Sequence, residues 1–334
     1  MNSRYLNSDP MPWLTDGKDP AVTYLAQVEL SGIKETDRLY RDLESSVLTH
    51  FFRAKRTDGI PGDKKNIDLV NRGTVWFFLL ASEYGYNSST PFISQTAEFI
   101  INKIMTPDGG FSLSIKPQIA VACRTGDVLR ALLKSGIRNE HTDAALSWII
   151  SKQRRDGSWL HCPFNGIRDL VKVFLFKKNG TGLIREHNDN IPGCPVATLS
   201  CIRALAAADD PSYKQSIEEG CRFLLNNSCF MHGSTTLPCG LTITPLKNGY
   251  PVMSQYDILS VMNELSHTSL WDHPLCGTLF NRIIKKQSPE GTWELENTSR
   301  GMVPGRRTKD RFVTLNVLRL LKSISEKENQ LEKA

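Results

Sequence analysis

Three cysteines have the residue type and the spacing to hold a metal ion. Each follows a loop and begins an apolar helical pattern: Cys123 in "VACRTGDVLRALL", Cys162 in "WLHCPFNGIRDLV" and Cys194 in "PGCPVATLSCIRALA". Zinc binds converging nitrogen and sulfur ligands, and three protein ligands leave a fourth position open for water or substrate. If the three helices are consecutive neighbours, their thiols meet at one rim, and the sequence predicts a zinc site there. The alternative is that the cysteines are packed as small buried hydrophobic residues.

Candidate acid–base residues lie near the same rim. His161 is adjacent to Cys162, and Tyr256 and Asp257 directly precede the helical pattern "ILSVMNEL". A carboxyl group that faces an apolar cavity has a raised pKa and can serve as a general acid. We therefore predict Asp257, Tyr256 and His161 as catalytic residues. The alternative for Asp257 is an acidic residue at a helix N-terminus that interacts with the helix dipole.

The elements that must position these residues form two alternating sets. In the first set, an apolar helical pattern ends in a turn that contains an acid, a glycine and usually an aromatic residue. Its members are "FIINKIMTPDGGF" (99–111), "WIISKQRRDGSW" (148–159) and "RIIKKQSPEGTW" (282–293), with weaker relatives "HFFRAKRTDGI" (50–60) and "RFLLNNSCFMHG" (222–233). Glycine permits a tight exit from a helix, the acid can accept backbone N–H bonds, and the aromatic can pack under a neighbouring repeat. These turns are expected to join successive helical hairpins.

The second set is expected to form the inner helices. Its members are "FFLLASEYG" (77–85), "LRALLKSG" (129–136), "IRDLVKVF" (167–174), "IRALAAAD" (202–209), "ILSVMNEL" (258–265) and "LRLLKSIS" (318–325). The apolar spacing favours helix throughout, and no segment has a convincing β-hairpin signal. Such an array either runs open as a solenoid or closes into a ring. We predict an all-α fold: a closed (α/α)6 toroid of alternating outer and inner helices over residues 35–325, with an N-terminal capping segment (1–34) and a polar C-terminal tail (326–334).

The repeats resemble those of a known superfamily. "QRRDGSW" and "QSPEGTW" are similar to the Gln-Trp repeats of squalene and terpenoid cyclases, and the alternating helices resemble the α/α toroid shared with the β subunits of protein prenyltransferases. The resemblance covers about residues 40 to 324. It implies a central cavity for an isoprenoid or other apolar substrate, with zinc at the rim if the chain follows the prenyltransferases.

The chain departs from both families at their characteristic motifs. The segment "GYPVMSQYDILSVMNEL" resembles the region where prenyltransferases supply a zinc-binding histidine, but Ser254, Gln255 and Tyr256 stand there. The Asp-x-Asp-Asp motif of the cyclases that protonate an alkene is also missing from the sequence. These departures argue against peptide-thiol prenylation and against protonation-driven squalene cyclisation.

A basic loop, "GRRTKDR" (305–311), leads into the last inner helix. Guanidinium groups bind phosphate oxygens in pairs, so Arg306, Arg307, Lys309 and Arg311, joined by Arg124, are candidates to hold a diphosphate. The alternative is an ordinary solvated loop.

Composition narrows the function classes. The net charge of +6 is mild and dispersed, which does not indicate nucleic-acid binding. No apolar run approaches the length of a membrane span, and the N-terminus lacks a signal-peptide pattern. We therefore expect a cytoplasmic protein, in which the eight cysteines do not predict disulfides.

Three functions follow. The first is an enzyme that binds an isoprenoid or other apolar substrate, with zinc at the cavity mouth. The second is a noncatalytic toroid that binds a lipid, peptide or protein. The third, a polysaccharide-active toroid, is weakened by an aromatic content of 8% and by the absence of a clear carboxylate pair. The sequence does not determine whether a partner subunit is needed.

Overall fold

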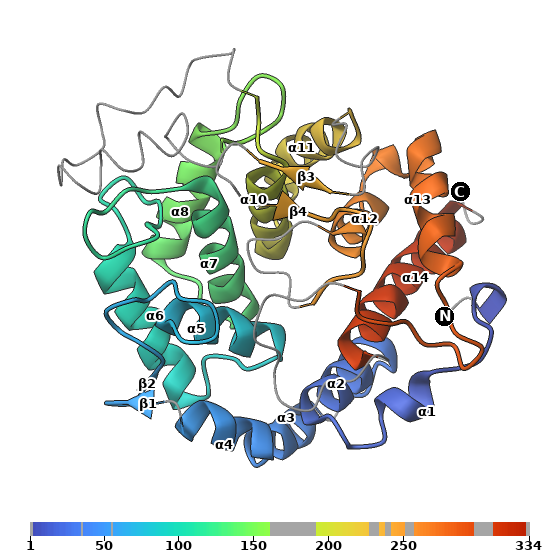
Figure 1. Ribbon diagram of the computed structural model, residues 1–334, viewed down its shortest axis with the longest axis horizontal. Coiled ribbons are helices and arrows are strands. Elements are labelled where there is room, and N and C mark those ends of the chain that lie inside the picture. The colour runs from blue at the N-terminus through green and yellow to red at the C-terminus, as the bar shows by residue number, and fades with distance from the viewer. Residues whose placement is uncertain are drawn as a thin grey trace. The chain divides into compact units, whose positions relative to one another are not determined.

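The computed structural model describes residues 3–34, 36–54, 56–160, 192–226, 234–237, 242–250, 257–296 and 310–331. Within these ranges the chain is mostly helical (Figure 1). It divides into two compact units. Unit 1 consists of Met1–Ala54, Leu246–Val252 and Asp257–Ala334, and unit 2 consists of Lys55–Pro245 and Met253–Tyr256. None of the helices in the described ranges combines the length and the apolar composition needed to cross a membrane.

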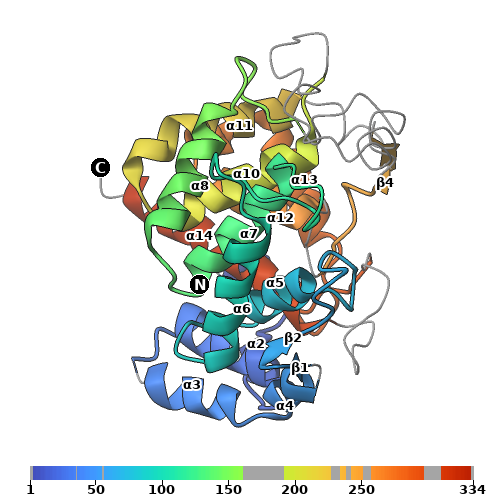
Figure 2. The same cartoon turned by 90° about the vertical axis from the view of Figure 1, so that its left-hand side faces the viewer.

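The described residues of unit 2 form three pairs of inner and outer helices. Its helices are α5 (Thr74–Glu83), α6 (Pro91–Ile104), α7 (Ala122–Lys134), α8 (Glu140–Ser151), α10 (Pro195–Ala208), the 3₁₀ helix η4 (Pro211–Tyr213) and α11 (Lys214–Asn226). The inner helix α7 packs against α5 on one side and α10 on the other, while α6, α8 and α11 pack behind them (Figure 2). All ten residues of α5 are buried, as expected of an inner helix that has neighbours on every side.

Unit 1 contains the N-terminal helices and the last helices of the chain. Its helices are η1 (Ser3–Tyr5), α1 (Met11–Leu14), α2 (Pro20–Leu25), the π-helix η2 (Ala26–Leu30), α3 (Thr36–Glu44), α4 (Val47–Ala54), α12 (Ile258–Ser266), η6 (Ser269–Asp272), α13 (Pro274–Ile284) and α14 (Arg311–Leu331). Here α14 packs against α12 and against α2 and η2, and α13 packs behind α12. The alternation of two helix sets is therefore present in both units.

The turns after the outer helices join successive hairpins, as the sequence predicted. In unit 2, Gln153 donates to the carbonyl of Ser216 on the next outer helix at 2.9 Å, and Gly157 has a φ of 81°. The corresponding Gln287 of unit 1 accepts from the N–H of Asn7 at 3.0 Å. A Cβ atom on Gly157 would lie 2.3 Å from the carbonyl oxygen of Glu219, so only glycine allows this approach.

The expectation of no β structure is wrong at two places. Strands β1 (Arg56–Thr57) and β2 (Ile60–Pro61) pair antiparallel, as do β3 (Thr235–Thr236) and β4 (Thr242–Ile243). The first pair is closed by Asp58 and Gly59, whose φ angles of 52° and 83° are those of a two-residue hairpin turn. The Asp-Gly turn of "KRTDGI" thus closes a hairpin instead of joining two helices.

The two helices that begin near Cys123 and Cys194, α7 and α10, are neighbours. The sequence placed a helix over 167–174 between the helices that begin near Cys123 and Cys194. That segment lies outside the described residues, and α7 and α10 pack directly against each other. Gly126 allows this approach, because a Cβ atom there would lie 2.5 Å from the backbone of Ser200.

Candidate functional site

Each of three inner helices is fixed to the aromatic residue of the turn that precedes it. The backbone N–H of Phe111 donates to the hydroxyl of Thr125 at 2.8 Å, and the N–H of Val121 donates back to the carbonyl of Phe111 at 3.1 Å. The same two-way contact recurs twice. Trp159 donates to Thr198 at 3.1 Å and accepts from Cys194 at 2.9 Å, and Trp293 donates to Thr314 at 3.0 Å and accepts from Asp310 at 3.1 Å.

These contacts set the rotation of α7, α10 and α14 about their axes. The threonine side of each helix faces the outer turn. An α-helix advances about 100° per residue, so a residue five positions later lies roughly 140° away, on the side turned away from that turn. In all three helices that residue is an arginine: Arg130, Arg203 and Arg319. The three arginines therefore occupy equivalent positions in the repeat.

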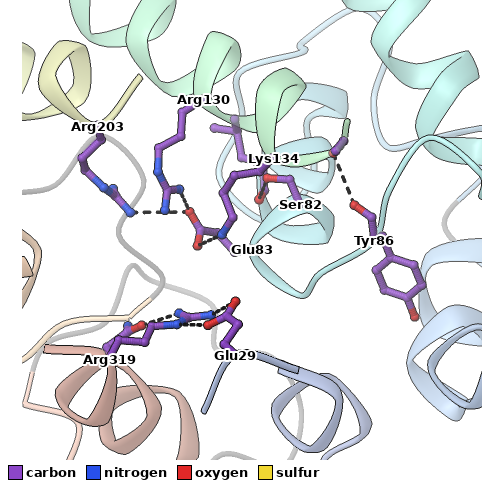
Figure 3. Close-up of polar contacts among 11 residues, drawn as sticks. Glu29, Ser82, Glu83, Tyr86, Arg130, Lys134, Arg203 and Arg319 are labelled. Carbon is purple, nitrogen blue, oxygen red and sulfur yellow. Dashed lines mark hydrogen bonds and ion pairs between the residues drawn. The ribbon is translucent and has the colours of Figure 1, made fainter. Parts of the chain in front are cut away.

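In unit 2, two of these arginines meet one buried carboxylate (Figure 3). Glu83, at the end of α5, forms an ion pair with Arg130 through Oε1 and lies 3.2 Å from the Nζ atom of Lys134 through Oε2. The Nη2 atom of Arg203 lies 3.6 Å from the same Oε1 atom. The Glu83 side chain is 11% exposed, and the three cations range from 11% to 24%. We call these four residues the Glu83 cluster; they bring α5, α7 and α10 together.

The cluster keeps Glu83 ionised. Burial alone would raise the pKa of this carboxyl group, but the positive charges of Arg130, Lys134 and Arg203 together hold the pKa well below its ordinary value. One negative and three positive side chains give the cluster a formal charge of +2.

The equivalent arginine of unit 1 has a different environment. Arg319 binds Glu29 through two hydrogen bonds, of 2.5 Å from Nε and 2.8 Å from Nη2, and donates to Asn316 at 2.7 Å (Figure 3). Both carboxylate oxygens of Glu29 thus bind a single guanidinium group. This fork geometry is the strong form of an arginine–carboxylate pair.

Two of the predicted phosphate-binding residues lie within the described part of the chain. Arg311 donates to both carboxylate oxygens of Asp16, at 2.8 Å each. The other is Arg124. It is the third residue of α7, its side chain is 7% exposed, and it forms an ion pair with Asp68. Burial lowers the pKa of Arg124, and its buried Nε atom has no hydrogen-bond partner among the described residues. Arg306, Arg307 and Lys309 lie outside the described residues, so a diphosphate site built from all five stays a prediction.

The predicted zinc ligands are described in part. Cys123 is the second residue of α7 and Cys194 is the N-cap of α10; both are buried. Within the described ranges, no group of three His, Cys, Asp or Glu side chains could hold a metal ion. Because Cys162 lies outside those ranges, the three-thiolate site stays a prediction.

Asp257 caps the inner helix α12. Its Oδ1 atom accepts from the N–H of Ser260 at 2.9 Å, its Oδ2 atom accepts from the N–H of Gly249 at 2.9 Å, and the residue is 2% exposed. The other two predicted catalytic residues, Tyr256 and His161, lie outside the described residues, and the acid–base role stays a prediction for all three.

Sequence reasoning missed the Glu83 cluster. The signal was present in part, because "LRALL", "IRALA" and "LRLLK" all place an arginine at the same point of the repeat. A threonine stands five residues before each of these arginines. If the threonines are assigned to the side of the helix that faces the outer turn, the arginines fall on the opposite side. The partner Glu83 gives no such signal, since it reads as the polar end of "FFLLASE".

Comparisons with known proteins give a structural similarity alone. No family model matches the chain, and no curated protein matches it. The structure of the type II terpene cyclase MstE from Scytonema aligns with 92% of this chain and 87% of its own, at 15% identity and a TM-score of 0.47. A variant of MstE in complex with its substrate, geranylgeranyl dihydroxybenzoate, aligns with 92% and 86%, at 14% identity and a TM-score of 0.45. At these values the similarity assigns no residue role and no substrate to this chain.

Proposed function

We propose that the chain is a closed (α/α)6 toroid that binds an isoprenoid or other apolar substrate in its central cavity. We further propose that it acts on this substrate as a prenyltransferase- or terpenoid-cyclase-like enzyme. Two features support the proposal: the Gln-Trp-type turns and the alternation of inner and outer helices. The predicted zinc–thiolate site at the cavity mouth is part of the same proposal.

The observation that carries the proposal is the common rotation of α7, α10 and α14. The same hydrogen bonds hold the threonine side of each helix toward an outer turn. In the proposed toroid, the opposite sides of these helices line the central cavity. On α10 this side carries Arg203 and Ala207, which are partly exposed, beside the buried Val196 and Ser200.

Ring closure is tested by small-angle X-ray scattering. A compact chain of this length has a radius of gyration of about 20 Å. We expect that value for a closed ring, whereas an open superhelix gives a clearly larger one. A larger radius for the monomer would refute closure.

Substrate binding is tested with geranylgeraniol and two neighbouring substitutions on α10. Ala207 is half-buried and lies about 180° from Thr198, whereas Ala206 is exposed. We expect Ala207→Trp to weaken binding about tenfold or more, because the added ring fills the proposed cavity, and Ala206→Trp to leave it unchanged. Equal effects of the two substitutions would contradict the proposed lining.

Catalysis and zinc need separate measurements. Incubation with isoprenoid alcohols and diphosphates, followed by mass spectrometry of extracted products, tests for turnover; binding without product would favour the noncatalytic alternative. We expect one zinc per chain by elemental analysis, and loss of that zinc in a folded Cys194→Ser variant. Metal-free wild-type protein would refute the zinc site and leave the isoprenoid proposal standing.

A further inference from the structure

We propose that the turn after α13 is a docking site for a short peptide segment, and that residues 3–9 occupy it as a displaceable ligand belonging to the same chain. We call residues 3–9 the N-terminal arm. The arm precedes α1 and contains one 3₁₀ turn, η1, but no α-helix. It contacts α13 and the turn that follows that helix, all within unit 1 (Figure 1). The site is independent of the proposed substrate.

The turns of unit 2 show what this surface receives elsewhere in the repeat. Two of their glycines with positive φ lie directly against the backbone of the next outer helix. A Cβ atom on Gly109 would lie 2.6 Å from the carbonyl oxygen of Ala144 on α8. A Cβ atom on Gly157 would lie 2.3 Å from that of Glu219 on α11. Each of these turns therefore receives an outer helix.

In unit 1 the N-terminal arm takes the place of that outer helix. A Cβ atom on Gly291, whose φ is 78°, would lie 2.0 Å from the carbonyl oxygen of Ser8. The backbone N–H of Asn7 donates to Oε1 of Gln287 at 3.0 Å, and the side-chain Nδ2 of Asn7 donates to the carbonyl of Ser288 at 3.2 Å. The same surface of the turn thus binds a segment of a different kind.

The arm satisfies this surface less fully than an outer helix does. In unit 2, Nε2 of Gln153 donates to the carbonyl of Ser216 on α11 at 2.9 Å. Among the described residues, the corresponding Nε2 atom of Gln287 is buried and has no hydrogen-bond partner. A buried donor without an acceptor has a free-energy cost, which lowers the stability of the docked arm. The docking site therefore keeps one donor that its present occupant does not use.

Two side-chain contacts complete the attachment of the arm. The ring of Tyr5 meets the ring of Phe280 on α13 edge to face, with centroids 5.1 Å apart. Arg4 forms an ion pair with Glu328 on α14, and both side chains are at least one-third exposed. Because exposed ion pairs contribute little, the ring contact and the hydrogen bonds of Asn7 hold the arm in place.

The arm is attached more weakly than the segment that follows it. None of residues 4–9 is buried. By contrast, Pro10 and Leu14 are both buried. Farther along, both carboxylate oxygens of Asp16 bind Arg311. A segment with few buried contacts opens at a lower free energy than the fold as a whole, so release of the arm should stop at Pro10.

Amide hydrogen exchange on the full chain measures opening of the arm. The N–H of Asn7 binds the docking site, whereas the N–H of Leu14 binds the carbonyl of Pro10 at 3.0 Å and belongs to the anchored segment. Tyr5→Ala removes the ring contact and keeps both of these hydrogen bonds. We expect exchange at Asn7 to become about threefold faster or more, and exchange at Leu14 to stay unchanged.

Tyr213→Ala is the matched control, because Tyr213 is also half-buried and also ends a 3₁₀ helix. We expect this control to leave exchange at Asn7 unchanged. Equal acceleration at Asn7 and Leu14 in Tyr5→Ala, or an unchanged rate at Asn7, would overturn an arm that opens separately from the rest of the chain.

Two glycine substitutions compare the arm with an outer helix. Gly157 and Gly291 have nearly the same φ, 81° and 78°, so alanine brings the same backbone strain to both. Gly157→Ala must displace α11, whereas the arm can leave the site in Gly291→Ala. We expect Gly291→Ala to speed exchange at Asn7 about tenfold or more and to lower Tm less than Gly157→Ala does. An equal or larger loss of Tm, with Asn7 still protected, would show that the arm is a fixed part of the repeat.

A labelled synthetic peptide of residues 3–9 tests the docking site itself. In the wild type the tethered arm competes at an effective concentration of about 1 mM, so the peptide should bind weakly. We expect the full chain with Tyr5→Ala and Asn7→Ala to bind the peptide about fivefold more tightly or better, and a further Gln287→Ala to cancel this gain. Fluorescence anisotropy measures each affinity. No binding to the double variant, or a gain that survives Gln287→Ala, would overturn the site.

Discussion

Replacing Thr125 by valine isolates the contact that fixes an inner helix to its turn. The two side chains have nearly the same shape, and Thr125 and Phe111 are both fully buried. The change removes the acceptor of the 2.8 Å hydrogen bond from the N–H of Phe111. The hydroxyl also donates to the carbonyl of Val121 at 3.0 Å, but that carbonyl keeps the N–H of Thr125 as a partner at 2.9 Å. One buried N–H group is therefore left without a partner.

The expected loss is about 1–3 kcal/mol in the free energy of unfolding, the cost of an unpaired buried donor. Thr96→Val is the control, because Thr96 is equally buried and its hydroxyl donates, at 2.5 Å, to the helical carbonyl of Phe92 alone. Removing this hydroxyl leaves no buried N–H group without an acceptor, so we expect the free energy of unfolding to change by less than about 1 kcal/mol. Urea unfolding followed by circular dichroism measures both. If Thr125→Val is no more destabilising than Thr96→Val, the contact does not stabilise the repeat.

Three further predictions concern other parts of the structure. The pKa of Glu83 is depressed in the folded state, so its stabilising contribution is present above the unfolded-state pKa of about 4.3 and is lost as pH falls below it. The free energy of unfolding, measured from pH 7 to 3, should therefore fall less steeply in Glu83→Gln than in the wild type. Equal slopes would contradict the charge assignment. Gly157→Ala should destabilise by about 1 kcal/mol or more, because the new Cβ meets a carbonyl of α11 at 2.3 Å, whereas Gly17→Ala, with a similar φ and nothing within 4 Å, should cost less in the same thermal-unfolding assay. Burial, followed by the negative charges of Asp127 and Cys194, holds the pKa of the Cys201 thiol well above its ordinary value, so this thiol should resist iodoacetamide at pH 8 until the protein unfolds; alkylation of the native protein at Cys201, found by peptide mass spectrometry, would disagree.

The repeat pattern was readable from the sequence because its signals are local. Apolar spacing and glycine-containing turns located α6, α8 and α13 with the turns that follow them, since the helix and its exit are specified within about fifteen residues. The aromatic residues of those turns were correctly expected to pack under a neighbour: Phe111, Trp159 and Trp293 are all fully buried.

What the sequence did not reveal depends on distant contacts or on competing local rules. The Asp58–Gly59 turn was grouped with the helical turns, although an Asp-Gly pair between residues with strand preference also specifies a hairpin. The direct packing of α7 on α10 depends on Gly126. A single glycine within a helical pattern does not indicate which other helix will pack against it. The Glu83 cluster joins residues 47 and 51 positions apart. Such pairing follows from tertiary packing, so no window along the sequence contains it.

The contact between each turn and the next threonine has a consequence for redesign. Thr125, Thr198 and Thr314 hold their helices by the side that faces the outer turn, and these contacts do not involve the side chains on the opposite side. Residues on that opposite side could be substituted one helix at a time while the contacts between the threonines and the outer turns are kept.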